Sequence, residues 1–141
     1  MFKISFDDLK AEFQRILLSL AFSNEKAELC ADIFASNSRD GVYSHGLNRF
    51  PVFVEYVQEG LVLPGVEPAV VSGFGAIESW DGNLAPGIYT ATLAMRRAVE
   101  LSAQFGIGCV AVKNTNHWMR GGTYGWQAAD AGFIGICITN L

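Results

Sequence analysis

The spacing of apolar residues changes near residue 66, and no other feature constrains the fold as strongly. Before this point apolar residues recur every three or four positions, a period typical of amphipathic helices. Three helices are predicted there: one capped by Ser5, one running from the Ser23-Asn24 cap to Asp40-Gly41, and one ending near Gly60. Pro51 in the third implies either a start near Asn48 or a kink. Short apolar runs separated by glycine-rich turns follow, so the sequence predicts an α/β chain with a helical domain over 1–66 and a sheet-containing domain over 67–141.

The second domain is predicted to begin a mixed sheet. Two short runs, over 69–72 and 76–80, flank a glycine-rich turn and predict an antiparallel hairpin. A long helix over 86–104, an apolar strand over 107–112, a short helix over 124–130 and a last apolar strand over 133–139 complete the predicted elements. The order of strand, helix and strand at the end implies a parallel pair of buried strands.

The composition indicates apolar surface on the folded chain. Apolar residues make up 50% of the sequence and charged residues only 17%, against roughly 25% in ordinary soluble domains. A compact, rather hydrophobic domain would explain this, but we favour a partner subunit or a further stretch of chain that covers the surface. The predicted last strand ends two residues before the end of the sequence, with no following element to cover it. We therefore expect these 141 residues to be the first part of a longer protein.

Charge and cysteine content argue against several classes of function. The net charge is −4 and no basic cluster accompanies the aromatic residues, so no nucleic-acid partner is expected. No apolar run is long enough for a membrane helix, and the first residues lack the apolar core of a signal peptide, so we expect a cytoplasmic protein without membrane contact. Cys30, Cys109 and Cys137 lie among apolar neighbours, which predicts reduced, buried thiols. No metal site is predicted, because neither histidine has a carboxylate at ligand spacing.

Polar chemistry concentrates in residues 39–53, between two predicted helices. Ser44 is expected to cap the third helix, which would place His45 at its N-terminus, with Arg49 and Phe53 one and two turns further along the same face. Such a stripe can supply an acid, a cation and a lid. The alternative is purely structural: a histidine that caps the helix and an arginine that is solvated.

A second polar stretch, residues 113–125, joins a predicted strand to a predicted helix. His117 and Arg120 supply polar groups, and Gly121 and Gly122 let backbone amides approach a ligand at a helix N-terminus, a position that favours anions. A phosphate or a carboxylate would fit there.

These stretches and their glycines also allow other interpretations. The glycines of the second stretch could simply form a tight turn, with Trp118 and Met119 filling a gap in the core. Residues 106–111 fit the dinucleotide-binding spacing G-x-G-x-x-A, but they follow a helix and open a strand, the reverse of the order in a Rossmann loop. The glycine spacing around Ser44 differs by one residue from that of a hydrolase nucleophile elbow.

Three stretches resemble a known enzyme family. Residues 43–50 (YSHGLNRF), 81–84 (DGNL) and 116–126 (NHWMRGGTYGW) closely resemble the N-terminal part of the malate/L-lactate dehydrogenase-like oxidoreductases, which lack a Rossmann fold. The resemblance extends over essentially the whole chain, although members of the family are more than twice as long. It implies a homodimeric reductase of small 2-keto acids that uses NAD or NADP in the reduced form. It also implies a helical part and a separate cofactor-binding sheet of non-Rossmann topology.

The resemblance implies roles for residues of the first polar stretch. His45 matches the proton donor of the family, and Ser44 matches its neighbour in a hydrogen-bond relay. Arg49 matches the residue that binds the substrate carboxylate. An acidic partner for His45 would lie beyond residue 141, as would much of the cofactor site.

The second polar stretch matches a wall of the substrate and nicotinamide pocket. His117 is assigned to the substrate, and Arg120, Gly121, Gly122 and Thr123 to the cofactor. Two alternatives stay open: a truncated, non-catalytic chain that only folds or dimerises, and an unrelated module that binds small anions.

Overall fold

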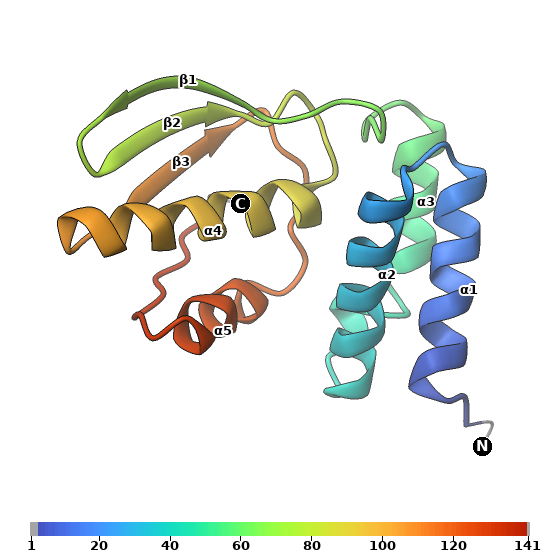
Figure 1. Ribbon diagram of the computed structural model, residues 1–141. Coiled ribbons are helices and arrows are strands. Elements are labelled where there is room, and N and C mark those ends of the chain that lie inside the picture. Colours follow the sequence, from blue (N-terminus) through green and yellow to red (C-terminus); the bar gives the residue numbers. More distant parts are fainter. Residues whose placement is uncertain (1–2, 141) are drawn as a thin grey trace. The chain divides into compact units, whose positions relative to one another are not determined.

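The computed structural model describes residues 3–140, and Figure 1 shows their elements. In chain order these are α1 (Phe6–Ser19), α2 (Asn24–Arg39), the 3-10 helix η1 (Tyr43–His45), α3 (Phe50–Gln58), β1 (Ala69–Phe74), β2 (Ile77–Asp81), α4 (Gly87–Phe105), β3 (Cys109–Lys113) and α5 (Gly122–Asp130). The chain divides into two compact units, Met1–Val66 and Glu67–Leu141. The structure confirms the predicted α/β class, in which a layer of three helices is followed by a mixed sheet.

The first two helices start and end where their capping residues predict. Ser5 Oγ accepts a hydrogen bond of 3.1 Å from the Asp8 amide, and Ser23 Oγ accepts one of 3.3 Å from the Lys26 amide. Each bond satisfies an amide that has no partner within the helix. After α2 the chain turns at Gly41, whose φ of 80° lies in the left-handed region that glycine adopts without strain.

A cluster of aromatic rings forms the core of the first unit. Phe50 stacks on Phe13 with ring centroids 4.1 Å apart and meets Phe34 edge-on at 5.1 Å. Phe53 lies 5.3 Å from Phe34 and 6.1 Å from Phe22. Pairs of this kind each add about 0.5 to 1.5 kcal/mol beyond the burial of their area. They join all three helices.

Of the two alternatives for the third helix, the structure confirms a start near Asn48. α3 begins at Phe50, and Pro51 stands in its first turn. The missing amide of a proline costs no hydrogen bond there, because first-turn amides have no partner within the helix.

A buried lysine holds the connector at the end of the first unit. Lys26 is 3% exposed, and its Nζ donates to the carbonyl oxygens of Pro64 at 3.0 Å and Val66 at 2.6 Å. The hydrogen bonds offset the cost of burying the ammonium group. They fix the main chain just before the boundary between the units.

The sheet of the second unit is mixed, with strand order β1-β2-β3. β1 and β2 pair antiparallel and confirm the predicted hairpin. β2 and β3 pair parallel, from Ile77 beside Cys109 to Asp81 beside Lys113. The predicted long helix, α4, connects these two strands and lies along one face of the sheet (Figure 1).

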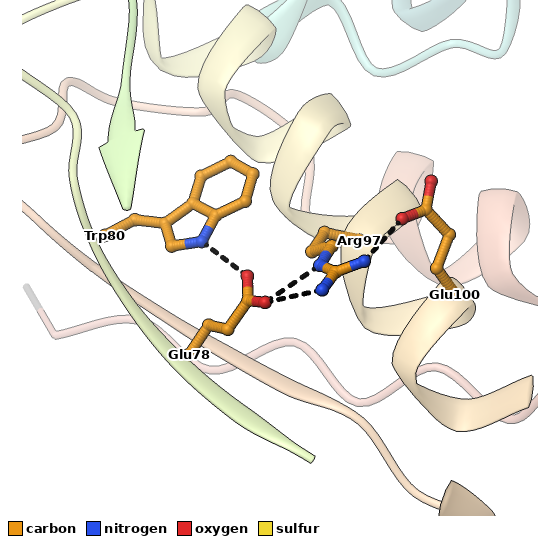
Figure 2. A network of polar contacts seen from close by, with 4 residues as sticks. All are labelled: Glu78, Trp80, Arg97 and Glu100. Atoms are coloured by element: carbon orange, nitrogen blue, oxygen red, sulfur yellow. Dashed lines mark hydrogen bonds and ion pairs between the residues drawn. The ribbon is translucent and has the colours of Figure 1, made fainter. Parts of the chain in front are cut away.

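An ionic network ties α4 to the sheet, as Figure 2 shows. Glu78 Oε1 accepts from Arg97 Nε at 2.9 Å and Nη2 at 2.7 Å, and Glu78 Oε2 accepts from Trp80 Nε1 at 2.9 Å. Arg97 also donates to Glu100 at 2.9 Å. The hydrogen bonds from Arg97 and Trp80 lower the pKa of Glu78, since they favour its charged form.

The prediction of a buried last strand is wrong. Residues 133–139 belong to no strand, and Ile134, Ile136 and Ile138 are 94%, 76% and 84% exposed. Their exposure still alternates with that of half-buried neighbours, as in a strand, but in the described part of the chain the sheet ends at β3. The β-α-β unit therefore consists of β2, α4 and β3 instead of β3, α5 and the last segment.

The predicted burial of β3 and of the cysteines is only partly correct. Residues of β3 alternate between exposed and half-buried, because α4 covers one face of the sheet. Cys30 is buried, which raises the pKa of its thiol to about 12, whereas Cys109 is exposed and Cys137 is half-buried. The expectation of exposed apolar surface is confirmed, since Phe74 is 90% exposed and Ile107 is 69% exposed.

Among residues 3–140, no helix has the length and apolar character to cross a membrane.

Candidate active site

Buried polar side chains of α2 hold the loop that carries His45. Asn37 is 2% exposed and donates from Nδ2 to the His45 carbonyl at 2.9 Å. The Leu47 amide donates to Ser38 Oγ at 2.8 Å, and the Ser38 hydroxyl donates to the Phe34 carbonyl at 2.9 Å. Buried polar groups are costly without partners, so this loop conformation satisfies both side chains of α2. The position of His45 therefore depends on α2.

Gly46 lets the loop approach the backbone of α2. A Cβ at Gly46 would overlap Ser38 Oγ, and it would lie 2.7 Å from the Ser38 nitrogen and 3.0 Å from the Phe34 oxygen. The supporting roles of Asn37, Ser38 and Gly46 were not predicted from the sequence. The sequence feature that could have indicated them is a pair of polar residues on the inner side of an amphipathic helix, together with a glycine directly after the histidine.

Ser44 contacts His45 directly. Ser44 Oγ lies 3.0 Å from His45 Nδ1, and the histidine tautomer determines which of the two atoms donates the hydrogen bond. The predicted helix cap is wrong, because both residues lie in η1 and α3 begins only at Phe50, with Arg49 as its N-cap residue. The observed contact instead places a hydroxyl where it can share a proton with the imidazole.

The predicted stripe of His45, Arg49 and Phe53 along one helix face is not formed. His45 lies in η1, and the turns over 46–49 separate it from α3. Phe53 is 2% exposed and belongs to the aromatic core, so its predicted role as a lid is wrong. His45 and Arg49 are both partly exposed.

In the second unit, the loops after β2 and β3 lie side by side, because parallel strands end at the same edge of a sheet. The Gly82 amide donates to the Lys113 carbonyl at 2.8 Å, and the Leu84 amide donates to the Asn114 carbonyl at 2.9 Å. Asn116 Nδ2 donates to the Leu84 carbonyl at 3.0 Å. Ligands of open α/β sheets bind at this edge. The DGNL and NHWMRGG stretches, which are far apart in the sequence, thus form one structural group.

Four residues of these loops have backbone conformations that few residues other than glycine adopt. The φ angles of Asn83, Leu84, Asn114 and Met119 are 51°, 61°, 49° and 65°. Each costs on the order of 1 kcal/mol, less for asparagine than for leucine or methionine. Such strain persists where the surroundings hold it and is concentrated at functional sites. The cluster supports these loops as part of the candidate site.

Asp81 links the two loops electrostatically. Its Oδ1 accepts from the Asn83 amide at 2.9 Å, and its Oδ2 accepts from Asn114 Nδ2 at 2.9 Å, with Lys113 Nζ 3.6 Å away. These contacts lower the pKa of Asp81, the Asn83 amide most of all, because each favours the carboxylate. The Asp81 carboxylate therefore connects the two loops through hydrogen bonds to each.

His117 is exposed, and its Nδ1 accepts a hydrogen bond of 2.9 Å from the Met119 amide. Met119 has a buried side chain, as the structural alternative predicted, while Trp118 stacks on Tyr124 with centroids 5.3 Å apart. The Tyr124 hydroxyl donates to the Trp118 carbonyl at 2.6 Å. The buried part of the loop thus supports an exposed imidazole.

The residues expected to contact the cofactor lie at the start of α5. A Cβ at Gly121, the N-cap residue, would meet only ordinary contacts at 3.8 and 3.9 Å, so packing within this chain does not require glycine there. Arg120 Nε lies 3.3 Å from the position of a Cβ at Gly122. The amides of Thr123 and Tyr124 donate to the carbonyls of Arg120 and Gly121. A cation beside a helix N-terminus suits an anion.

The candidate residues fall in both units. Ser44, His45 and Arg49 belong to the first, whereas His117 and residues 120–123 belong to the second. The structure brings Ser44 to His45 and Arg120 to the start of α5. Within residues 3–140, no group of three or more His, Cys, Asp or Glu could hold a metal ion.

Comparison with known proteins identifies the family. Residues 4–141 match the model of the malate/L-lactate dehydrogenase family. The 2,3-diketo-L-gulonate reductase of Escherichia coli is 51% identical over 138 residues, which are 98% of this chain but 42% of that relative. Malate dehydrogenase from Entamoeba histolytica superimposes with a TM-score of 0.90 at 27% identity, over 93% of this chain and 37% of the other. Malate dehydrogenase from Pyrococcus horikoshii gives the same TM-score and identity, over 93% of this chain and 38% of the other.

These curated relatives are considerably longer than the chain, which spans about 42% of their length. The match nevertheless covers nearly all of its own residues and includes both polar stretches. The chain belongs to the malate/L-lactate dehydrogenase family of oxidoreductases.

Proposed function

We propose that the chain forms the proton-donating and carboxylate-binding part of a reductase that acts on a 2-keto acid, 2,3-diketo-L-gulonate or a similar compound. The hydride would come from NADH or NADPH. The observation that carries the proposal is the 3.0 Å contact between Ser44 Oγ and His45 Nδ1, in a stretch that resembles the catalytic stretch of the family. The 51% identity to relatives named 2,3-diketo-L-gulonate reductase supports the substrate class.

His45 would supply the proton. Addition of a hydride to a ketone leaves an alkoxide oxygen, which a histidine can protonate because imidazole titrates near neutral pH. The contact with Ser44 at Nδ1 would orient the ring and leave Nε2 to face the substrate oxygen. Asn37, bonded to the His45 carbonyl, would keep the main chain of the donor in place.

Arg49 would bind the substrate carboxylate. A guanidinium presents two parallel N–H donors that match the two oxygens of a carboxylate. That geometry would decide which carbon of the substrate faces the hydride. Arg49 is suited to this role because it is partly exposed, while the next residue, Phe50, anchors the start of α3 in the aromatic core.

A reduced nicotinamide cofactor supplies the hydride when it is bound. Arg120, Gly121, Gly122 and Thr123 would hold one of its anionic groups at the start of α5, and His117 would contact the substrate. We further infer a homodimer in the cytoplasm, which is supported by the resemblance to the family and by the exposed apolar surface of the second unit.

Replacement of Arg49 tests the proposal in the protein at its natural length. Arg49→Met keeps much of the apolar stem but leaves the carboxylate unpaired, at a cost of roughly 2 to 5 kcal/mol. At 1.4 kcal/mol per tenfold change, kcat/KM for 2-keto acids should fall by about 30-fold to several thousand-fold. Arg49→Lys should recover only part of this, since an ammonium lacks the planar fork.

The comparison substrate is an uncharged 1,2-diketone, for which Arg49→Met should change kcat/KM far less. Arg15→Met, which removes an exposed cation of α1 paired with Glu12, is the matched control and should leave both activities unchanged. Equal losses for the charged and neutral substrates would show that Arg49 is structural and would refute its assignment. Absence of any cofactor-dependent reduction in the unmodified protein would refute the proposed activity.

A further inference from the structure

The hydrogen bond at His117 restricts where the imidazole can carry its proton. The Met119 amide donates to His117 Nδ1 at 2.9 Å. A backbone N–H can only donate, so Nδ1 must offer a lone pair and cannot itself carry a hydrogen. In the neutral imidazole the hydrogen then resides on Nε2.

The backbone of Met119 is strained in the conformation that makes this bond. Its φ of 65° is unusual for a residue with a side chain, and methionine has no short polar group that could bond locally in compensation. The conformation persists because the side chain is 4% exposed and the preceding carbonyl, that of Trp118, accepts from the Tyr124 hydroxyl at 2.6 Å. The loop thus holds an amide against the imidazole at an energetic cost.

The main chain of His117 is fixed as well. A Cβ at Gly87, in the first turn of α4, would overlap the Asn116 carbonyl oxygen and lie 2.7 Å from the His117 carbonyl oxygen. Asn116 Nδ2 bonds the carbonyls of Leu84 at 3.0 Å and Ala85 at 3.3 Å. These contacts position the backbone of His117, yet the residue stays exposed. An imidazole held in this way but not buried suits contact with a ligand.

We propose that Met119 is a positioning residue that holds His117 in the tautomer with its hydrogen on Nε2, so that His117 acts on the substrate as a hydrogen-bond donor. The role toward the substrate rests on the proposed function, whereas the tautomer does not. His45 differs in the group at its Nδ1, because the Ser44 hydroxyl can donate or accept and so tolerates the gain and loss of a proton. The hydroxyl contact thus suits His45 to proton transfer, whereas the amide contact suits His117 to donating a hydrogen bond from Nε2.

Nitrogen NMR of histidine-labelled protein tests the tautomer. The sequence has two histidines, so two sets of ring signals are expected, and His117→Gln removes and thereby assigns one set. At a pH where the ring is neutral, His117 should show an unprotonated Nδ1, a protonated Nε2 and a coupling across the hydrogen bond to the Met119 amide. A protonated Nδ1, or no coupling to that amide, would overturn the proposal. Magic-angle-spinning spectra give the same readout from sedimented protein.

Two variants of Met119 separate positioning by the backbone from packing by the side chain. Met119→Gly adopts a positive φ without strain and should keep the Nε2-protonated form, although it removes a buried side chain. Met119→Val disfavours a positive φ and should shift the tautomer ratio by about 2- to 10-fold toward protonated Nδ1. If both variants shift the ratio equally, side-chain packing and not the amide orients His117, and the assignment of the amide fails.

Kinetics of the natural-length protein test the role toward the substrate. The amide of His117→Gln can donate from near the position of Nε2, so kcat/KM for 2-keto acids should fall less than about tenfold. His117→Leu removes the donor and should lower it by about 100- to 1000-fold. Equal losses in the two variants would indicate proton transfer by His117 and overturn the donor role. An unmodified protein without keto-acid reductase activity would refute the proposed function and the substrate role together, while the NMR result would still decide the tautomer.

Discussion

Gly46→Ala should displace the loop that carries His45. The new Cβ would overlap Ser38 Oγ and lie 2.7 Å from the Ser38 nitrogen, which belongs to the backbone of α2 and cannot rotate away. Crowding against a packed backbone typically costs about 1 to 3 kcal/mol. Loss of the Leu47 amide bond to Ser38 would add about 1 kcal/mol, and the lower entropy of the unfolded alanine chain would return about 0.5 kcal/mol. We expect a net decrease of roughly 1.5 to 3.5 kcal/mol in the free energy of unfolding.

Urea unfolding followed by far-ultraviolet circular dichroism measures this loss. All three tryptophans, Trp80, Trp118 and Trp126, lie in the second unit, so fluorescence would miss a change confined to the first. Hydrogen exchange supplies the local readout, because the Leu47 amide should lose its protection.

Gly65→Ala is the matched control, since a Cβ at Gly65 would meet no atom within 4 Å and its φ is not positive. Its effect should stay within about 0.5 kcal/mol. If Gly46→Ala is as mild as the control and Leu47 stays protected, the loop does not depend on close approach to α2, and our account of how His45 is held is refuted.

Three further outcomes follow from the same structure. In the natural-length protein, His45→Ala should lower kcat by about 10² to 10⁴ with little change in cofactor affinity, and activity within threefold of the unmodified protein would exclude His45 as the proton donor. Glu78→Gln should lower the free energy of unfolding by about 1 kcal/mol, as measured by urea titration, because the partly exposed pair with Arg97 loses its charge. Since the pKa of Asp81 is lowered in the folded state, its stabilising contribution is present above the ordinary value of 3.8 and is lost as the pH falls through the lowered folded value. Unfolding free energies measured at a series of acidic pH values should show this loss. In Asp81→Asn the decrease of the unfolding free energy with falling pH should be smaller.

Features that depend on contacts between near neighbours in the chain could be predicted from the sequence alone. Ser5 and Ser23 cap helices by bonds to amides three residues away, and Gly41 ends α2 by its own backbone conformation. Such interactions are contained within a short window, so composition and spacing reveal them. The hairpin of β1 and β2 follows for the same reason, since one short turn joins its strands. The motifs around His45 and His117 likewise identified the family.

The pairing of the strands and the contacts that hold the site residues depend on packing between distant parts of the chain. β3 pairs with β2 across the whole of α4, and the apolar segment over 133–139 stays outside the sheet, although both segments have the apolar pattern of a buried strand. The bond from Leu47 to Ser38 and the close approach of Asn116 to Gly87 join residues in different elements. Periodicity indicates which residues favour burial, but it carries no information on which distant backbone will meet them. For that reason the sequence located His45 and His117, whereas the packing of α2 and α4 revealed what positions them.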